Sequence, residues 1–474
     1  MADRTAENLV GNLFKGIRWT GIAAGVQFLL GLVQTYVLVR LLDKADFAAM
    51  ALIQVFGGLF LQAQYAVFQS AVIQQKHISA GQLRRLLQLS MWAAAGVFLV
   101  FWLIGIYLGC QYGEGAMANL AAVFGAGLGI YTIGGVHRAW LYREFRYKTL
   151  FINELIGFSL YFIVTVVLAR LHFGPFSLAF GFAAKLVVES LFHRLKNQYW
   201  RDAPPAPIRE LKHFFQFGRA HLAERMVTQL VFSLDYLLIG RWLGLDALGV
   251  YDVFKRALVR PAALATEALE RAVFPVYSRL QGHPWRLRTM YLALLNGIAT
   301  VHLPVYTALF FLSPWITTWY FGADWTEYAG VFRALSLFVV FHAMLNPVDH
   351  FLLSQGKINR WTVTSLGYGL LTAGLIWFLQ DKDLVAVSYG IAGSHALLLC
   401  FSWIGLLHPL LRAGFGEFVN SVAVPALISL GAAAGLFILP PDLIIAGVSV
   451  YLGLFGYLTH RFNRSFFRLV KKLF

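Results

Sequence analysis

Seven ionisable side chains stand close together in one short segment of this sequence. The segment, residues 252–271, reads DVFKRALVRPAALATEALER, and apolar sequence flanks it on both sides. At about 100° per residue of an α-helix, all seven fall on one side, opposite Val253, Phe254 and Leu258. Because guanidinium and ammonium groups are the usual means of holding phosphate oxygens, the pattern favours an anion site.

The candidates for binding a phosphate group are the cationic residues of this segment together with two arginines of other apolar runs. They are Arg256, Arg260, Lys255, Arg225 and Arg333. A purely structural alternative stays open, because Asp252 stands three and four residues before Lys255 and Arg256, a spacing that allows ion pairs within one helix. Glu267 and Arg271 allow another such pair, and Arg225 and Arg333 could each be held by a neighbouring carboxylate.

Polar residues elsewhere in the apolar runs suit two further tasks. Amides and aromatic rings suit sugar hydroxyls and ring faces, and the candidates are Gln27, Gln34, Gln62, Asn153 and Tyr251. Buried carboxylates or a histidine could couple transport to protons or sodium, and the candidates are Asp235, Glu154, Glu189 and His221. For each of these four, a satisfied structural pair is the alternative.

Apart from the coupling protons or sodium ions, the motifs of this sequence predict no cofactor. His342, Asp349 and His350 match no metal-ligand spacing, so we expect no metal site. A Gly-rich phosphate loop of the Walker type does not occur in the sequence, which argues against direct ATP hydrolysis. The two cysteines lie in or beside separate apolar runs and do not suggest a disulfide framework.

The elements that position these residues are membrane helices. Of 474 residues, 59% are hydrophobic and 13% are charged, and the mean hydropathy is +0.65. Apolar runs of about 20 residues, enough to cross a bilayer of roughly 30 Å, recur along the chain. A charge facing lipid there would cost at least ~2.5–3.5 kcal/mol, so the charged face must contact water or protein. We predict about 14 transmembrane helices, near residues 17–39, 47–73, 86–109, 116–136, 149–170, 176–193, 220–240, 249–275, 288–312, 328–348, 358–380, 384–408, 419–439 and 442–460.

Loop charges orient these helices. Most of the 39 lysines and arginines fall in the connections on one side, which predicts that both chain termini are cytoplasmic. The net charge of +16 then describes a cytoplasmic face against anionic membrane lipids and not a nucleic-acid site.

A Pro-rich connector divides the chain into two lobes. We predict an N-terminal lobe of six helices at 1–193, a cytoplasmic linker at 194–218, a second lobe at 219–408, and two further helices with a basic tail at 409–474. YVLVRLLDKADFAAM near the start of the first lobe resembles YLLIGRWLGLDALGVY near the start of the second. Both copies begin inside, so the repeat is parallel, an arrangement that usually lines a central site.

Several motifs of this sequence resemble those of a known family. They are YVLVRLLDKADFAAMALI, AVIQQKHISAGQLRRL, AWLYREFRYKTLFINEL and FGRA…LDYLLIGRWLGLDALGVYDVFKRA…RAVFPVYSRLQ. The sequence is thereby similar to the polysaccharide-transporter (Wzx-like) branch of the multidrug/oligosaccharidyl-lipid/polysaccharide flippase superfamily. The resemblance implies an all-α fold in which two pseudo-symmetric six-helix lobes enclose a central cavity, with two peripheral helices.

The resemblance also implies a function. The expected protein is a flippase of the bacterial inner membrane, and its substrate is an oligosaccharide repeat unit linked to undecaprenyl pyrophosphate. It would serve surface or exopolysaccharide biosynthesis, beside a polymerase or export complex. A flippase for the lipid II type of precursor and a multidrug antiporter of the same superfamily remain alternatives. The connections on the outer side are short, so we do not expect a membrane glycosyltransferase or another enzyme.

Overall fold

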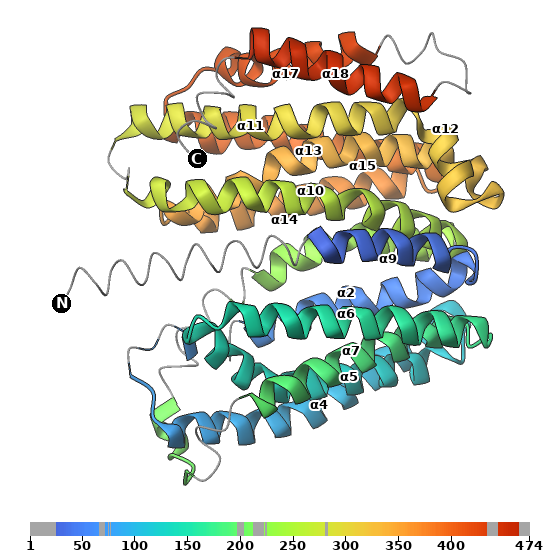
Figure 1. The fold of residues 1–474 in the computed structure, drawn as a ribbon, viewed down its shortest axis with the longest axis vertical. Helices are drawn as coiled ribbons and strands as arrows, with labels where there is room; N and C mark the ends of the chain where they lie inside the picture. Colours follow the sequence, from blue (N-terminus) through green and yellow to red (C-terminus); the bar gives the residue numbers. More distant parts are fainter. Residues whose placement is uncertain are drawn as a thin grey trace. The chain divides into compact units, whose positions relative to one another are not determined.

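The described part of the chain forms two compact units. A computed structural model describes residues 25–65, 72–73, 75, 77–196, 203–211, 222, 225–279, 283–433 and 444–463, without the side chains of 267–276, 278–279, 444–446 and 462. The first unit is Met1–Gly249 and the second is Val250–Phe474 (Figure 1). The predicted division into lobes, linker and C-terminal helices stays a prediction, because these units are defined by contacts alone.

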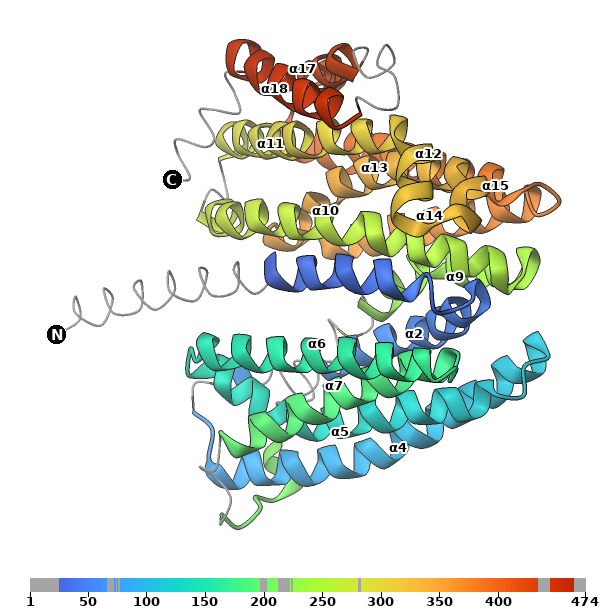
Figure 2. The same ribbon diagram turned by 45° about the vertical axis from the view of Figure 1, so that its right-hand side comes forward.

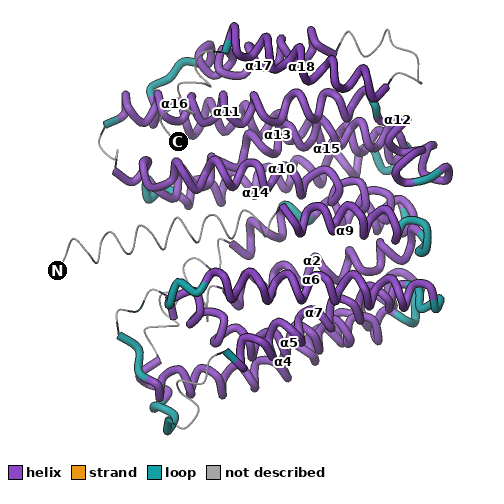
Figure 3. The backbone as a smooth tube through the Cα atoms, in the orientation of Figure 1, coloured by secondary structure: helices purple, strands orange, loops and turns teal. Residues whose placement is uncertain are grey.

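Helices make up almost all of the described chain, and no strand occurs among its residues (Figure 3). The first unit contains the helix Gly25–Leu38, α2 (Lys44–Gln64), α4 (Ala80–Tyr112), α5 (Met117–Arg143), α6 (Tyr147–Arg170), α7 (Pro175–Leu195), a 3₁₀ turn (Ile208–Leu211) and α9 (Leu234–Leu243). The helix α10 (Leu245–Arg279) begins in the first unit and continues into the second.

The second unit is helical throughout its described residues. After α10 it contains α11 (Pro284–Phe311), α12 (Ser313–Ile316), a π-helical turn (Thr317–Phe321), a 3₁₀ turn (Ala323–Tyr328), α13 (Ala329–Ser354), α14 (Ile358–Phe378), α15 (Leu384–Phe401), a π-helical turn (Ser402–Leu407), α16 (His408–Leu411), α17 (Phe415–Ala433) and α18 (Ile444–Phe462). The predicted all-α membrane class is confirmed. Nine of the described helices are long and apolar enough to cross a membrane, and the count of 14 stays a prediction.

For two of the predicted helices, the different ends change where a charged side chain lies. The predicted span 116–136 continues to Arg143, which moves Arg138 from a connection into α5. The predicted span 220–240 is interrupted at residues 232–233, and α9 begins at Leu234. Asp235 explains this second start, because its carboxylate accepts a hydrogen bond (3.0 Å) from the Tyr236 N–H, and a carboxylate is favourable in a first helical turn.

Small residues set the crossing of α5 and α7 in the first unit. A Cβ atom on Gly127 would lie 2.8 Å from the Ala183 Cα, and one on Gly134 would lie 2.8 Å from the Ser190 Cα. Gly134 follows Gly127 by seven residues, and Ser190 follows Ala183 by seven residues. The two helices therefore approach closely along two turns. This crossing fixes the positions of the side chains next to Ser190 and Gly134, which form the polar cluster described below.

Leucine in place of Gly134 is therefore expected to force the two helices apart. Overpacking of this kind costs about 1–3 kcal/mol, so we expect a lower melting temperature and a lower yield of monodisperse protein in detergent. Gly96→Leu is the matched control, because nothing lies within 4 Å of a Cβ atom there and its stability should be unchanged. Equal melting temperatures for the two variants would contradict the close crossing.

In the second unit, α11 contacts α10 where Pro261 interrupts its hydrogen bonds. The Tyr306 hydroxyl donates to the Leu258 carbonyl (2.6 Å), and the His302 Nε2 lies 3.2 Å from the Ala262 carbonyl. The proline leaves the Ala257 carbonyl without its helical donor, and these contacts tie α11 to the carbonyls on either side of the proline. The helix α17 packs along α11 and α18 packs on α17, as Figures 1 and 2 both show.

Candidate functional sites

The charged segment of α10 is divided between the surface and the interior of the second unit. Val253, Phe254 and Leu258 are buried, as the helical periodicity predicts. Arg256 and Arg260 are exposed, and they stand one helical turn apart on the same side. The side chains of Glu267, Glu270 and Arg271 lie outside the described residues. The surface part of the segment is thus a pair of arginines.

One of the two arginines has an acidic partner in its own helix. The Arg256 Nε lies 2.6 Å from the Asp252 Oδ1, the i, i+4 pair that the sequence allowed. The two partners differ in exposure, at 2% for the Asp252 side chain and 42% for the Arg256 side chain. The buried carboxylate of Asp252 therefore holds the Nε of Arg256, while much of the arginine side chain remains on the surface.

Lys255 lies inside the second unit against aromatic rings. Its ammonium lies 5.1 Å from the ring centroids of both Tyr251 and Phe338. Such cation–π contacts contribute about 0.5–2 kcal/mol each when the cation is desolvated. Phe338 in turn contacts His395, and the Tyr368 hydroxyl lies 2.9 Å from the His395 Nδ1. The buried Lys255 ammonium thus contributes positive electrostatic potential beneath the surface of α10. The buried Tyr251 ring stabilises this ammonium through the cation–π contact.

The structure brings Arg333 to a different place. Its Nε donates to the Ser313 hydroxyl (2.8 Å), and its guanidinium lies over the Phe310 ring at 6.0 Å. Its partner is thus a hydroxyl at the junction of α11 and α12, where the sequence suggested a carboxylate. Arg225 is exposed in the first unit, and no ion pair joins it to a described residue. The five predicted cations therefore do not form a single cluster within either unit.

A second polar cluster lies in the first unit, between α5, α6 and α7. Glu189 is 4% exposed, and its Oε1 lies 3.8 Å from the Lys185 Nζ. The Asn153 amide donates to the Glu189 main-chain carbonyl (2.9 Å). A Cβ atom on Gly157 would lie 2.7 Å from the Glu189 Oε1, so the glycine makes the room that this carboxylate occupies.

Arg138 completes this cluster, and the sequence did not single it out. Its Nε is shut off from solvent, and its guanidinium lies 4.4 Å from the Tyr131 ring centroid. It interacts electrostatically with the carboxylates of Glu189 and Glu154. The cluster of Arg138, Glu154, Lys185 and Glu189 therefore contains two cations and two anions, of which Glu189 is buried and the others are half-buried.

Of the remaining predicted residues of the first unit, one contacts this cluster directly. The Gln27 amide donates weakly to Glu154 (3.5 Å), and Gln62 is half-buried. Gln34 is buried, and its Nε2 has no hydrogen-bond partner among the described residues. Asp235 is buried at the start of α9 and is not joined to the cluster by the contacts described. His221 lies outside the described residues.

The two clusters differ in what they can do chemically. The surface arginines of α10 can donate several charge-assisted hydrogen bonds to an anion. The first-unit cluster combines cations and carboxylates, and of these side chains only Glu189 is fully buried. Within the described residues, no three His, Cys, Asp or Glu side chains converge in a way that could hold a metal ion.

Comparison with known proteins gives one family match and several relatives. Residues 37–330 match the model of a family described as polysaccharide biosynthesis protein. The lipopolysaccharide biosynthesis protein WzxC of Escherichia coli (strain K12) is 22% identical over 419 residues, covering 88% of this chain and 85% of WzxC. The teichuronic acid biosynthesis protein TuaB of Bacillus subtilis (strain 168) is 23% identical over 435 residues, covering 89% and 88%.

A solved structure shares the fold at low sequence identity. The lipid II flippase MurJ, in an inward closed conformation, aligns with a TM-score of 0.78 at 11% identity. The alignment covers 94% of this chain and 99% of that chain. At this identity the likeness shows the fold and does not extend to the substrate.

Proposed function

Because this chain belongs to the polysaccharide biosynthesis protein family, we propose that it is a flippase that moves a lipid-linked oligosaccharide repeat unit across the bacterial inner membrane. Membership confirms its resemblance to the polysaccharide-transporter branch of the flippase superfamily. In the proposal, the lipid carrier is undecaprenyl pyrophosphate, both termini are cytoplasmic, and alternating access delivers the substrate to the periplasmic leaflet. The names of the relatives and the shared fold of a flippase support this role.

The exposed arginines of α10 are the observation that carries the proposal. Arg256 and Arg260 stand on one helix face about 6 Å apart at their Cβ atoms, the spacing of i, i+4 neighbours. A pyrophosphate carries two phosphoryl groups, and each guanidinium can bind one of them through two parallel N–H donors. The buried ammonium of Lys255, one residue before Arg256, adds to the positive potential.

The polar residues of the first unit divide into two groups under this proposal. Gln27 and Gln62 are only partly buried and keep amide groups that could reach sugar hydroxyls. Asn153 and Gln34, and Tyr251 in the second unit, are buried, so they support neighbouring side chains in this conformation. We therefore assign the contacts with the glycan part of the substrate to Gln27 and Gln62.

Ion coupling is assigned to the first-unit cluster. Glu189 and Glu154 both interact electrostatically with Arg138, so protonation of one carboxylate, or binding of sodium, would change the net charge of this partly buried cluster. A charge change in a low-dielectric interior shifts the balance between two conformations more strongly than one at the surface. We do not assign Asp235 to ion coupling, because its carboxylate accepts a main-chain hydrogen bond at the start of α9.

The two alternatives within the superfamily are less well supported. A lipid II flippase would bind the same pyrophosphate, but the family match names polysaccharide biosynthesis, and the MurJ likeness is one of fold. A multidrug antiporter that accepts cations would need an acidic or neutral surface, whereas the exposed ionisable residues described within residues 252–266 of α10 are arginines.

The test is the leaflet distribution of the lipid-linked repeat units. In cells that carry the matching glycan pathway but lack this gene, we expect the units to accumulate in the cytoplasmic leaflet. Labelling of the glycan by a membrane-impermeant reagent, in intact and in lysed spheroplasts, measures the two pools. Complementation by the wild-type gene should restore the outer pool. Unchanged distribution in the deletion strain would refute the assignment as a flippase.

A further inference from the structure

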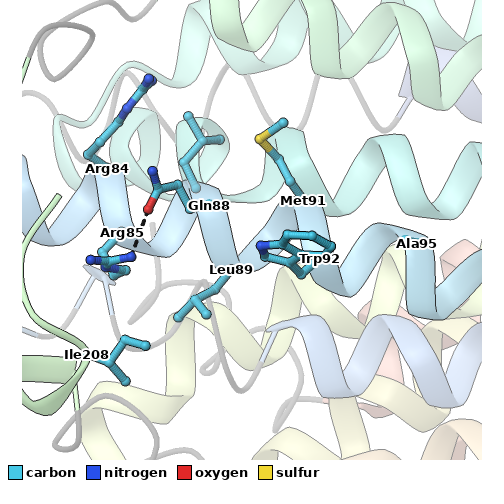
Figure 4. Close-up of a pocket in the computed structure, with 9 residues that line it drawn as sticks. Arg84, Arg85, Gln88, Leu89, Met91, Trp92, Ala95 and Ile208 are labelled. Carbon is cyan, nitrogen blue, oxygen red and sulfur yellow. Dashed lines mark hydrogen bonds between the residues drawn. The ribbon is translucent and has the colours of Figure 1, made fainter.

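A hollow at the start of α4 has no part in the proposed transport site. It has a volume of about 840 Å³, and both charged and apolar side chains of α4 line it, together with Ile208 of the segment 203–211 (Figure 4). Arg84, Arg85 and Gln88 form the polar end, and Met91 and Trp92 form the apolar end. The sequence along the helix thus changes from basic to aromatic and aliphatic within two turns.

The position of this change relative to the membrane follows from the helix itself. Residues 91–110 contain no charged side chain, and a run of about 20 such residues fills the hydrocarbon core of a bilayer. The boundary of the hydrocarbon core therefore lies near Met91 and Trp92, and Trp92 is 80% exposed, as is typical of an interfacial tryptophan. At 1.5 Å per residue, Arg84 and Arg85 lie about 10 Å farther out, among lipid head groups.

The segment 203–211 closes one side of the hollow and is fixed to α4. The Ala206 N–H donates to the Gly81 carbonyl (2.9 Å), and the Arg85 Nε donates to the Ala206 carbonyl (2.7 Å). The Arg85 Nη1 also donates to the Gln88 amide oxygen (3.0 Å). The hollow is therefore a built site with an oriented arginine, and it belongs wholly to the first unit.

The two arginines retain unused hydrogen-bond donors. A guanidinium has five N–H groups, and Arg85 uses two of them in the bonds to Ala206 and Gln88. Arg84 forms no hydrogen bond or ion pair within the part of the chain that the structure describes. The remaining N–H groups match an anionic oxygen ligand at head-group depth, and the adjoining apolar wall matches an acyl chain.

We propose that this hollow binds one anionic phospholipid. The phosphodiester lies between Arg84 and Arg85, and the first part of one acyl chain runs along Met91 and Trp92 toward the bilayer centre. The charge of the two arginines selects an anionic lipid, because each basic residue near a membrane surface favours such lipids. The proposal is independent of the transported substrate, since no residue of the two polar clusters takes part.

Quenching of Trp92 by brominated lipids tests the site. The protein is reconstituted in phosphatidylcholine, and the Trp92 signal is the difference between wild type and Trp92→Phe. We expect phosphatidylglycerol with brominated acyl chains to quench this signal at about tenfold lower mole fraction than brominated phosphatidylcholine. Arg84→Gln keeps the bond between Arg85 and Ala206, and it should reduce the preference several-fold without loss of folded protein.

Two controls separate this site from general charge effects. Arg360→Gln removes an exposed arginine from the first turn of α14, on the same predicted face, and should leave the preference unchanged. Inorganic phosphate at constant ionic strength should not relieve the quenching. Equal quenching by the two lipids, an unchanged preference in Arg84→Gln, or relief by inorganic phosphate would each overturn the proposal.

Discussion

Replacement of Arg138 by methionine is expected to abolish transport and to reduce stability. The change removes the guanidinium that interacts with the carboxylates of Glu154 and Glu189, and Glu189 is almost completely buried. The cost should be smaller than the about 3–5 kcal/mol of a broken buried ion pair, because the Lys185 ammonium stays 3.8 Å from the Glu189 Oε1. The melting temperature in detergent and the outer pool of lipid-linked repeat units measure the two effects.

A second substitution distinguishes a role in transport from a role in folding. Arg138→Met combined with Glu189→Gln removes a positive and a negative charge together, and neutral groups of similar shape are often as stable as the buried pair. We expect this double variant to regain the melting temperature of the wild type but not its transport. Arg194→Met, at the exposed end of α7, is the control for loss of an arginine. Recovery of transport in the double variant would make the cluster purely structural.

The sequence predicted the helices well because the bilayer imposes their length. Apolar runs of about 20 residues predict spans whatever the tertiary contacts are, and most of the predicted ranges agree with the described helices to within a few residues. The helical period also placed Val253 and Phe254 on the buried side of α10. Both results depend on patterns within one helix.

The predictions that were incomplete depend on contacts between helices. Arg138 follows a long apolar run, so the apolar pattern predicts it in a basic connection, although α5 continues past it and leaves it half-buried with its Nε shut off from solvent. Spacing along one helix predicts the pair of Asp252 with Arg256, which is present. It contains no information about which residues of α6 and α7 lie near Arg138, because that depends on how α5 packs against those helices.

The break before α9 shows a further limit of sequence patterns. No glycine or proline marks residues 232–233, so an apolar run across them predicts one continuous helix. The start at Leu234 instead follows from Asp235, whose carboxylate satisfies a main-chain N–H of the new first turn. An aspartate inside an apolar run has therefore two interpretations, as a coupling group or as a helix start, and the structure favours the second here.

Alanine at both Arg256 and Arg260 is expected to remove the pyrophosphate site of the proposed flippase. Hydrogen bonds to charged groups contribute about 1.5–3 kcal/mol each, so loss of both guanidinium groups should weaken substrate binding by about 100-fold or more. Cells that carry the double variant at normal protein level should accumulate lipid-linked repeat units in the cytoplasmic leaflet. Full rescue of the deletion strain by the double variant would assign these arginines to structural pairing.

Asp252→Asn supplies the matched comparison, because it breaks the 2.6 Å ion pair and keeps both arginines. If Arg256 acts on the substrate, Asp252→Asn should retain much of the transport while Arg256→Ala loses it. If the pair serves only the fold of α10, both single variants should lower the melting temperature equally, and the double variant Asp252→Asn with Arg256→Ala should add little. The ratio of transport to stability across these variants therefore separates the two roles, since Asp252→Asn and Arg256→Ala both break the pair and only Arg256→Ala removes a substrate-binding guanidinium.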